Sequence, residues 1–113
     1  MSARTAWAAG APFAIATAGL LAIGQAPAAP APTVHTVVIA KMRFGPLPKD
    51  VRAGDVILWV NKDLVKHTAT ARDRSFNLDL AAGASGKMVI RNAGSIAFYC
   101  IYHPGMKGVL VAK

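Results

Sequence analysis

The sequence contains a single cysteine, Cys100, so no disulfide can form within the chain. Acidic residues are also few: five stand against 13 lysines and arginines, which gives a formal net charge of +8. After Ile23 no apolar run is long enough to cross a bilayer. A small exported domain without disulfides often depends on a bound metal for stability. The lone thiol is therefore a candidate metal ligand.

The first 28 residues have the composition of a secretory signal peptide. Arg4 supplies a basic start, residues 6–23 are almost wholly apolar, and residues 26–28 form an Ala-Pro-Ala cleavage site. We expect cleavage after Ala28 and export to the periplasm. An uncleaved membrane anchor is the alternative, because the 18 residues of the apolar run are at the lower limit for spanning a bilayer. Pro12 and Gly19 within the run weaken that alternative.

The remaining chain divides into a Pro/Ala linker at residues 29–33 and one domain at residues 34–113. The 85 residues after the cleavage site keep a net charge of +7, because Arg4 is the only charge removed. A basic surface favours acidic partners. The basic residues are spread out and lack interleaved exposed aromatics, so we do not expect nucleic acid as a partner. The mature chain is expected to be a soluble monomer.

Short runs rich in valine, isoleucine and aromatic residues alternate with turn residues over the whole domain. This pattern predicts strands at residues 33–40, 42–44, 56–61, 67–71, 86–91, 95–100 and 108–112. Seven or eight short strands without helical periodicity predict an all-β sandwich. Four large side chains within these strands are expected in the core: Met42, Trp59, Met88 and Phe98.

Three side chains with metal-binding chemistry follow one another near the carboxyl end. Cys100, His103 and Met106 occupy positions i, i+3 and i+6, and the intervening Pro104 and Gly105 favour a tight loop. A thiolate, an imidazole and a thioether can therefore reach one point. A second histidine from another loop would complete a plane of two histidines and one cysteine with a weak axial methionine. That ligand set is typical of type 1 (blue) copper.

His67 is the candidate for the second histidine. It stands 33 residues before Cys100, at the end of the loop at residues 62–66, and two such loops can meet at one end of a sandwich. His35 is the competitor, but it lies inside an alternating strand and is interpreted as a surface histidine. The predicted ligands of one copper ion are therefore His67, Cys100, His103 and Met106.

Simpler interpretations of the same residues remain open. Cys100 is alternatively a buried core thiol, and Met106 a core side chain. A thiol hydrolase would instead pair Cys100 with His103 as nucleophile and base. Such an enzyme needs a third, orienting group that the sequence does not suggest, and a free thiolate oxidises readily in an exported protein. We therefore expect a protein that is not an enzyme.

With these motifs the chain resembles the cupredoxins, and within that family the amicyanin branch. The resemblance covers residues 34–113 and rests on matching segments at residues 39–42, 54–56, 98–100, 103–106 and 108–111, together with Trp59, Asn61 and His67. It implies a Greek-key β-sandwich of about eight strands, one type 1 copper ion, and transfer of single electrons between redox proteins. The short Cys-x₂-His-x₂-Met loop is typical of amicyanins.

Three residues beside the predicted ligands differ from the usual family pattern. Thr68 replaces an asparagine and Ile101 a small hydroxyl residue, so the hydrogen bond that joins the two ligand loops is expected to be lost or replaced. Tyr102 replaces a proline and keeps its N–H. We hypothesise that the backbone N–H groups of Thr68 and Tyr102 both donate to the Cys100 sulfur, which would raise the reduction potential.

In the family that the chain resembles, electrons pass through the exposed ring edge of the carboxyl-side histidine, here His103. The resemblance implies an apolar docking patch around it, formed by Pro46, Val65, Tyr102, Pro104 and Gly105, with Lys62, Lys66 and Lys107 at the rim. We expect brief docking of an acidic partner face. The resemblance further implies a quinoprotein dehydrogenase as donor and a c-type cytochrome as acceptor. A copper delivery or storage module is the alternative function.

Overall fold

The computed structural model describes residues 31–113 and seven positions before them: residues 2, 3, 10, 12, 14, 19 and 24. The expected signal peptide (residues 1–28), apart from those positions, and the first two residues of the expected linker lie outside the described residues. Among the described residues, no helix is both long and apolar enough to cross a membrane.

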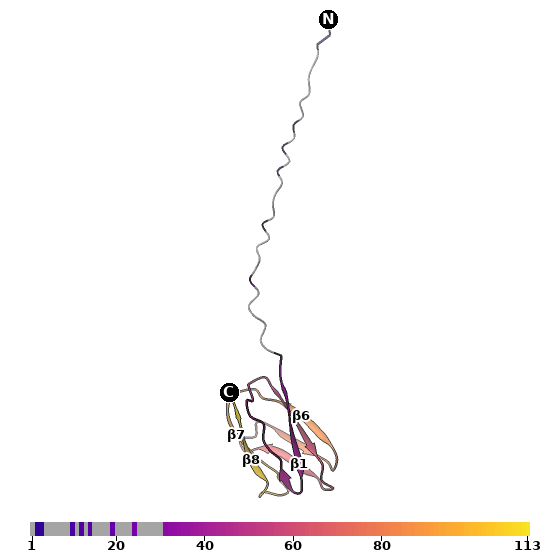
Figure 1. The fold of residues 1–113 in the computed structure, drawn as a ribbon, viewed down its shortest axis with the longest axis vertical. Helices are drawn as coiled ribbons and strands as arrows, with labels where there is room; N and C mark the ends of the chain where they lie inside the picture. The colour runs from indigo at the N-terminus through magenta and orange to yellow at the C-terminus, as the bar shows by residue number, and fades with distance from the viewer. Residues whose placement is uncertain are drawn as a thin grey trace.

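Two four-stranded sheets form the described domain (Figure 1). The first sheet has the order β2 (Arg43–Phe44), β1 (Val34–Ala40), β3 (Val56–Asn61) and β6 (Ser85–Val89). The second has the order β5 (Asn77–Leu80), β4 (His67–Ala71), β7 (Gly94–Tyr99) and β8 (Lys107–Ala112). β1 and β3 are parallel, and the other paired strands are antiparallel. The expected all-β sandwich is confirmed.

β5 is not among the strands that the sequence pattern predicts. It has four residues: Leu78 and Leu80 are at least partly buried, whereas Asn77 and Asp79 are exposed. An amphipathic strand of this length contains too few alternations to stand out from the preceding turn. The seven strands that the sequence does predict are present, with ends within two residues of the expected ones.

Aromatic rings from both sheets fill the centre of the sandwich. Trp59 and Phe98 are fully buried, as expected, with ring centroids 5.1 Å apart in an edge-to-face arrangement. Phe44 completes the group, 4.8 Å from Phe98 and 5.8 Å from Trp59. Gly108 in β8 allows this packing, because a Cβ atom there would lie only 2.6 Å from Phe98 Cζ.

The two methionines expected in the core have different environments. Met88 in β6 packs against the core. Met42 does not: its side chain is 42% exposed, and it lies in the turn between β1 and β2 with a φ of 59°. The prediction for Met42 is wrong because the chain reverses direction at Lys41 and Met42, which the run of strand-forming residues does not reveal.

Asp55 ties the start of β1 to the turn before β3. Its carboxylate accepts hydrogen bonds from the backbone N–H groups of Thr33 (3.1 Å) and Arg52 (2.9 Å), and it lies 2.9 Å from Nε2 of His35. The bond with His35, followed by the two backbone bonds, lowers the pKa of Asp55 to about 2. The His35 side chain is only 12% exposed, so it is not the surface residue that the sequence suggests.

Candidate metal centre

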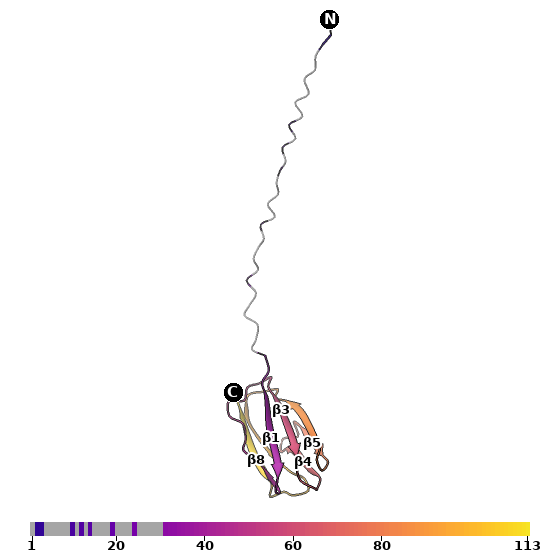
Figure 2. The same cartoon turned by 45° about the vertical axis from the view of Figure 1, so that its right-hand side comes forward.

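β1 and β3 run parallel and finish at the same end of the sandwich (Figure 2). Three of the four predicted metal ligands meet at this end. His67 begins β4, Cys100 follows β7, and His103 lies in the loop before β8. One side-chain donor atom of each lies within 4.8 Å of the other two. The Cys100 sulfur is 3.7 Å from His67 Nδ1, and the two histidine rings have centroids 5.2 Å apart. This arrangement is a possible metal site.

Backbone hydrogen bonds fold the loop after β7 around Cys100. The N–H of His103 donates to the Cys100 carbonyl (3.3 Å), and the N–H of Met106 donates to the His103 carbonyl (2.8 Å). The Cys100 N–H in turn donates to the Met106 carbonyl (3.0 Å), which closes the loop. Met106 is buried in the same core cluster as Cys100. The loop therefore brings the backbone of Met106, the fourth predicted ligand, next to that of Cys100.

Both histidines leave their Nδ1 atoms available to a metal. Nε2 of His67 lies 2.8 Å from the carboxylate of Asp63, so it carries the proton and Nδ1 keeps a lone pair facing the sulfur. Nδ1 of His103 is buried and has no hydrogen-bond partner among the described residues. A buried nitrogen without a partner is costly unless something binds it. The donor set and the unpartnered nitrogen therefore fit a soft, imidazole-binding metal such as copper.

Asp63 is a functional residue that the sequence analysis missed. Besides holding His67, its carboxylate accepts the backbone N–H groups of Lys41 (2.7 Å) and Met42 (2.9 Å). Both of these residues have left-handed backbone angles, with φ of 53° and 59°. The Met42 amide, followed by the His67 ring, lowers the pKa of Asp63 and keeps it ionised. The only signal in the sequence is an acidic residue four positions before a predicted ligand.

Thr68 joins the two ligand loops. Its backbone N–H donates to the Cys100 sulfur (3.3 Å), and its hydroxyl oxygen accepts the backbone N–H of Ile101 (2.9 Å). The side-chain bond between the loops is thus replaced and not lost. Here the residue after His67 supplies the hydroxyl group, whereas in the family pattern the residue after the cysteine does.

The Tyr102 N–H approaches the Cys100 sulfur closely enough to favour the thiolate, in the direction that the sequence analysis expects. Only the Thr68 N–H, at 3.3 Å, has the geometry of a full hydrogen bond to the sulfur. Burial raises the pKa of the Cys100 thiol, but hydrogen bonding from backbone amides, first that of Thr68, contributes to a pKa that is lowered overall. The thiol is therefore poised to bind a metal as thiolate.

Exposed apolar residues surround the loops of this end. The residues expected in the docking patch are all exposed: Pro46, Val65, Tyr102, Pro104 and Gly105. Leu64, which the sequence analysis did not include, is 96% exposed and adjoins them in sequence. Lys66 lies over the Tyr102 ring, with Nζ 5.5 Å from the ring centroid, and Lys107 is also exposed.

A buried thiol and two imidazoles at one end of an eight-stranded sandwich define a class of small β proteins with a single metal centre. The chain belongs to the cupredoxin family, because the family model of the Cupredoxin-like domain matches residues 13–112. At the level of that family, the donor set of the site fits a blue copper centre.

Known proteins agree with this assignment. Amicyanin of Paracoccus denitrificans is 25% identical over 92 residues, which cover 68% of this chain and 63% of that protein. The chain therefore spans somewhat less than two thirds of this relative. A copper(I) form of an amicyanin variant has 25% identity and a TM-score of 0.61, covering 75% of this chain and 85% of the other. Amicyanin of Paracoccus versutus gives 24% identity and a TM-score of 0.61 over the same shares.

Proposed function

We propose that this protein is an exported blue copper protein that carries single electrons between redox proteins. One observation supports it above the others: a buried thiol lies 3.7 Å from the free Nδ1 of His67, and the buried Nδ1 of His103 has no partner among the described residues. Within the described residues the sulfur accepts the Thr68 N–H and neither Nδ1 atom has a partner other than that sulfur, whereas a metal ion would bind all three atoms.

In this proposal His67, Cys100 and His103 would hold the copper ion, and Met106 would be a fourth, weaker ligand. When bound, the ion supplies a one-electron change between Cu(II) and Cu(I). Thiolate and thioether donors favour Cu(I), whereas imidazole accepts either state. The β-sheet ends and the closed loop hold these donors in fixed positions, so little rearrangement accompanies the gain or loss of an electron.

Burial of the donors argues against catalysis at this site. His67 and Cys100 are fully buried and Met106 nearly so. Four protein ligands leave no open position for a substrate, whereas catalytic metal sites keep one for water or substrate. The chain's own residues therefore exclude water and position the donors, and electron transfer is the chemistry that remains.

The exposed patch around His103 is the proposed docking surface. Its apolar centre, with Lys66 and Lys107 beside it, suits a brief encounter with an acidic partner face. A quinoprotein dehydrogenase as donor and a c-type cytochrome as acceptor are the proposed partner classes. Export to the periplasm, with residues 1–28 removed, belongs to the same proposal, and the mass of the protein purified from its native host tests the cleavage.

Titration of the metal-free protein with Cu(II) tests the proposal. We expect one equivalent to produce an intense absorption band at the red end of the spectrum, from charge transfer between thiolate and copper. Cys100→Ser should lose that band, whereas Thr36→Ser, an exposed position of β1, should keep it. A wild-type protein that folds and binds copper without colour would contradict the proposal and favour a copper delivery or storage module.

A further inference from the structure

A basic hollow lies on the outer face of the second sheet, apart from the docking patch around His103. It has a volume of about 410 Å³. Thr70 of β4 pairs with Asn77 of β5 on one side and with Tyr99 of β7 on the other, so these three side chains share one face. Arg72 and Arg74, from the turn after β4, also line it, as do Ala71, Phe76 and Ile101. We call this hollow, with its polar residues Thr70, Arg72, Arg74 and Asn77 and the Tyr99 ring, the arginine hollow.

The arginine hollow presents hydrogen-bond donors to solvent. The Arg72 guanidinium lies over the Tyr99 ring, with Cζ 4.5 Å from the ring centroid, which restrains its position. Within residues 31–113 neither Arg72 nor Arg74 forms an ion pair. Asn77 Oδ1 accepts the Thr70 hydroxyl (2.8 Å), so the Asn77 amide NH₂ is left as a further donor.

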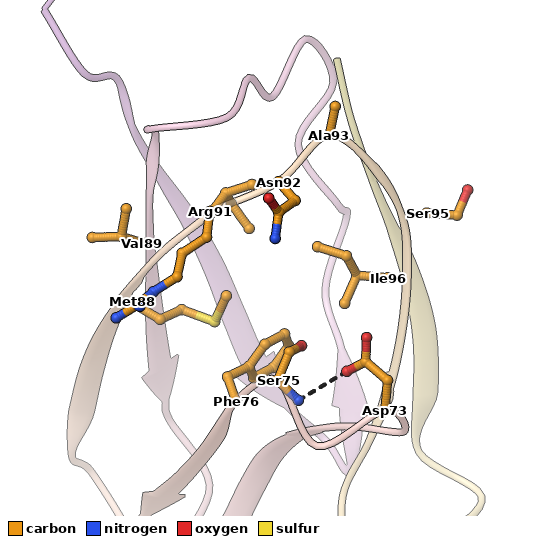
Figure 3. Close-up of a pocket in the computed structure, with 11 residues that line it drawn as sticks. Asp73, Ser75, Phe76, Met88, Val89, Arg91, Asn92, Ala93, Ser95 and Ile96 are labelled. Atoms are coloured by element: carbon orange, nitrogen blue, oxygen red, sulfur yellow. Dashed lines mark hydrogen bonds between the residues drawn. The ribbon is translucent and has the colours of Figure 1, made fainter.

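The neighbouring carboxylates do not neutralise these arginines. Asp73 lies between them in sequence, but it lines a separate cavity of about 170 Å³ (Figure 3). There its carboxylate accepts the Ser75 backbone N–H at 2.9 Å. Asp79 is two residues beyond Asn77 in β5. It lies opposite Thr68 in the strand register and does not line the hollow. Two guanidinium groups and an amide therefore face a hollow without an acidic wall.

We propose that the arginine hollow binds a carboxylate side chain from an acidic segment of a partner protein. Charge complementarity carries the proposal, because planar guanidinium groups pair with carboxylates through two parallel hydrogen bonds. The stacked Arg72 loses less side-chain freedom on binding than a free arginine would. The chain's net charge of +8 attracts such a partner over a longer range. Carboxylate binding at the arginine hollow does not require the metal, so this proposal can be tested independently of the proposed function.

Nuclear magnetic resonance titration of the ¹⁵N-labelled protein with an acetylated hexaglutamate peptide at low ionic strength tests this proposal. We expect the largest shift changes at the amides of Thr70, Arg72, Asn77 and Tyr99. Arg72→Gln/Arg74→Gln should weaken peptide binding at least about fivefold. Arg43→Gln/Arg91→Gln removes the same charge from exposed sites elsewhere and should weaken it less than about twofold. Unchanged peak dispersion will show that both variants are folded.

Four results would overturn the proposal. Equal weakening by both double variants would show that only net charge matters. Shift changes centred on Val65 and Tyr102 would assign the peptide to the docking patch. Inorganic phosphate binding as tightly as the peptide would make the hollow a small-anion site. Binding of phosphatidylglycerol vesicles that depends on Arg72 and Arg74, with no peptide binding, would assign it to a lipid surface. The titration is run with and without copper, so failure of copper binding alone would contradict only the proposed function.

Discussion

The two ends of the sandwich each contain a histidine paired with an aspartate, yet only one pair belongs to a metal site. His67 and Asp63 are 2.8 Å apart, and His35 and Asp55 are 2.9 Å apart. The difference lies in what each pair faces. Each carboxylate also accepts two backbone N–H groups, so this is not what distinguishes the pairs. The second nitrogen of His67 lies 3.7 Å from a buried thiol, whereas His35 lies at the end of the sandwich away from that thiol. A histidine held by an aspartate is therefore a candidate metal ligand only when its other ring nitrogen faces a second donor atom that could bind the same ion.

Replacing the two histidines should separate these roles most strongly. His67→Ala removes a proposed ligand, so we expect copper affinity to fall at least about a hundredfold, more than for a change behind a ligand. His35→Ala should leave copper affinity within about twofold. Competition with a chelator of known affinity measures both. Equal losses in the two variants would mean that His67 acts through folding and not as a ligand.

Replacing the two aspartates gives a smaller and more specific difference. The ionised Asp63 stabilises the more positive state of the bound ion through His67, so Asp63→Asn should favour Cu(I) and raise the reduction potential. A tenfold change in relative affinity corresponds to about 59 mV for one electron, and we expect a shift of that order. Asp55→Asn should change the potential by less than about a fifth of this amount. Redox titration of both variants decides the matter, and equal potentials would contradict the role of Asp63.

The tie between the ligand loops should contribute modestly to stability. Thr68→Val keeps the shape of the side chain but leaves the partly buried N–H of Ile101 without its acceptor, which is expected to cost about 1 kcal/mol of unfolding free energy. Thr36→Val, at an exposed position of β1, should cost less than about 0.5 kcal/mol. Urea unfolding of the metal-free proteins measures both. A neutral Thr68→Val would show that water satisfies the Ile101 N–H.

The Asp55 pair should show itself in the pH dependence of stability at the other end. The pKa of Asp55 is lowered from 3.8 to about 2 in the folded protein, so its contribution is present above about pH 4 and lost as the pH falls toward 2. We therefore expect the urea midpoints of wild type and Asp55→Asn to differ at pH 5 and to converge by pH 2. A difference that persists at pH 2 would exclude the carboxylate charge as the cause.

Much of the metal site could be predicted from the sequence because it depends on local spacing. Cys100, His103 and Met106 lie on one loop, so their separation along the chain nearly fixes their separation in space. His67 could be placed because it ends a loop at the same end of the sandwich. The fold could be predicted because alternating runs and turns recur throughout the domain.

The remaining features depend on backbone geometry that residue type does not encode. Asp63 resembles an ordinary exposed loop carboxylate until its three hydrogen-bond donors are known. The left-handed angles at Lys41 and Met42 occur without glycine, so nothing in the sequence marks them. The absence of proline at Tyr102 predicts an available N–H, but residue type alone does not give its distance and angle to the Cys100 sulfur.

X-ray absorption spectroscopy at the copper edge of the oxidised protein tests the central claim most directly. If two imidazoles and one thiolate converge on one point, the inner shell of copper will contain two nitrogens and one short sulfur, without water. A shell made of nitrogen and oxygen alone, with the Cys100 sulfur absent, would contradict the account.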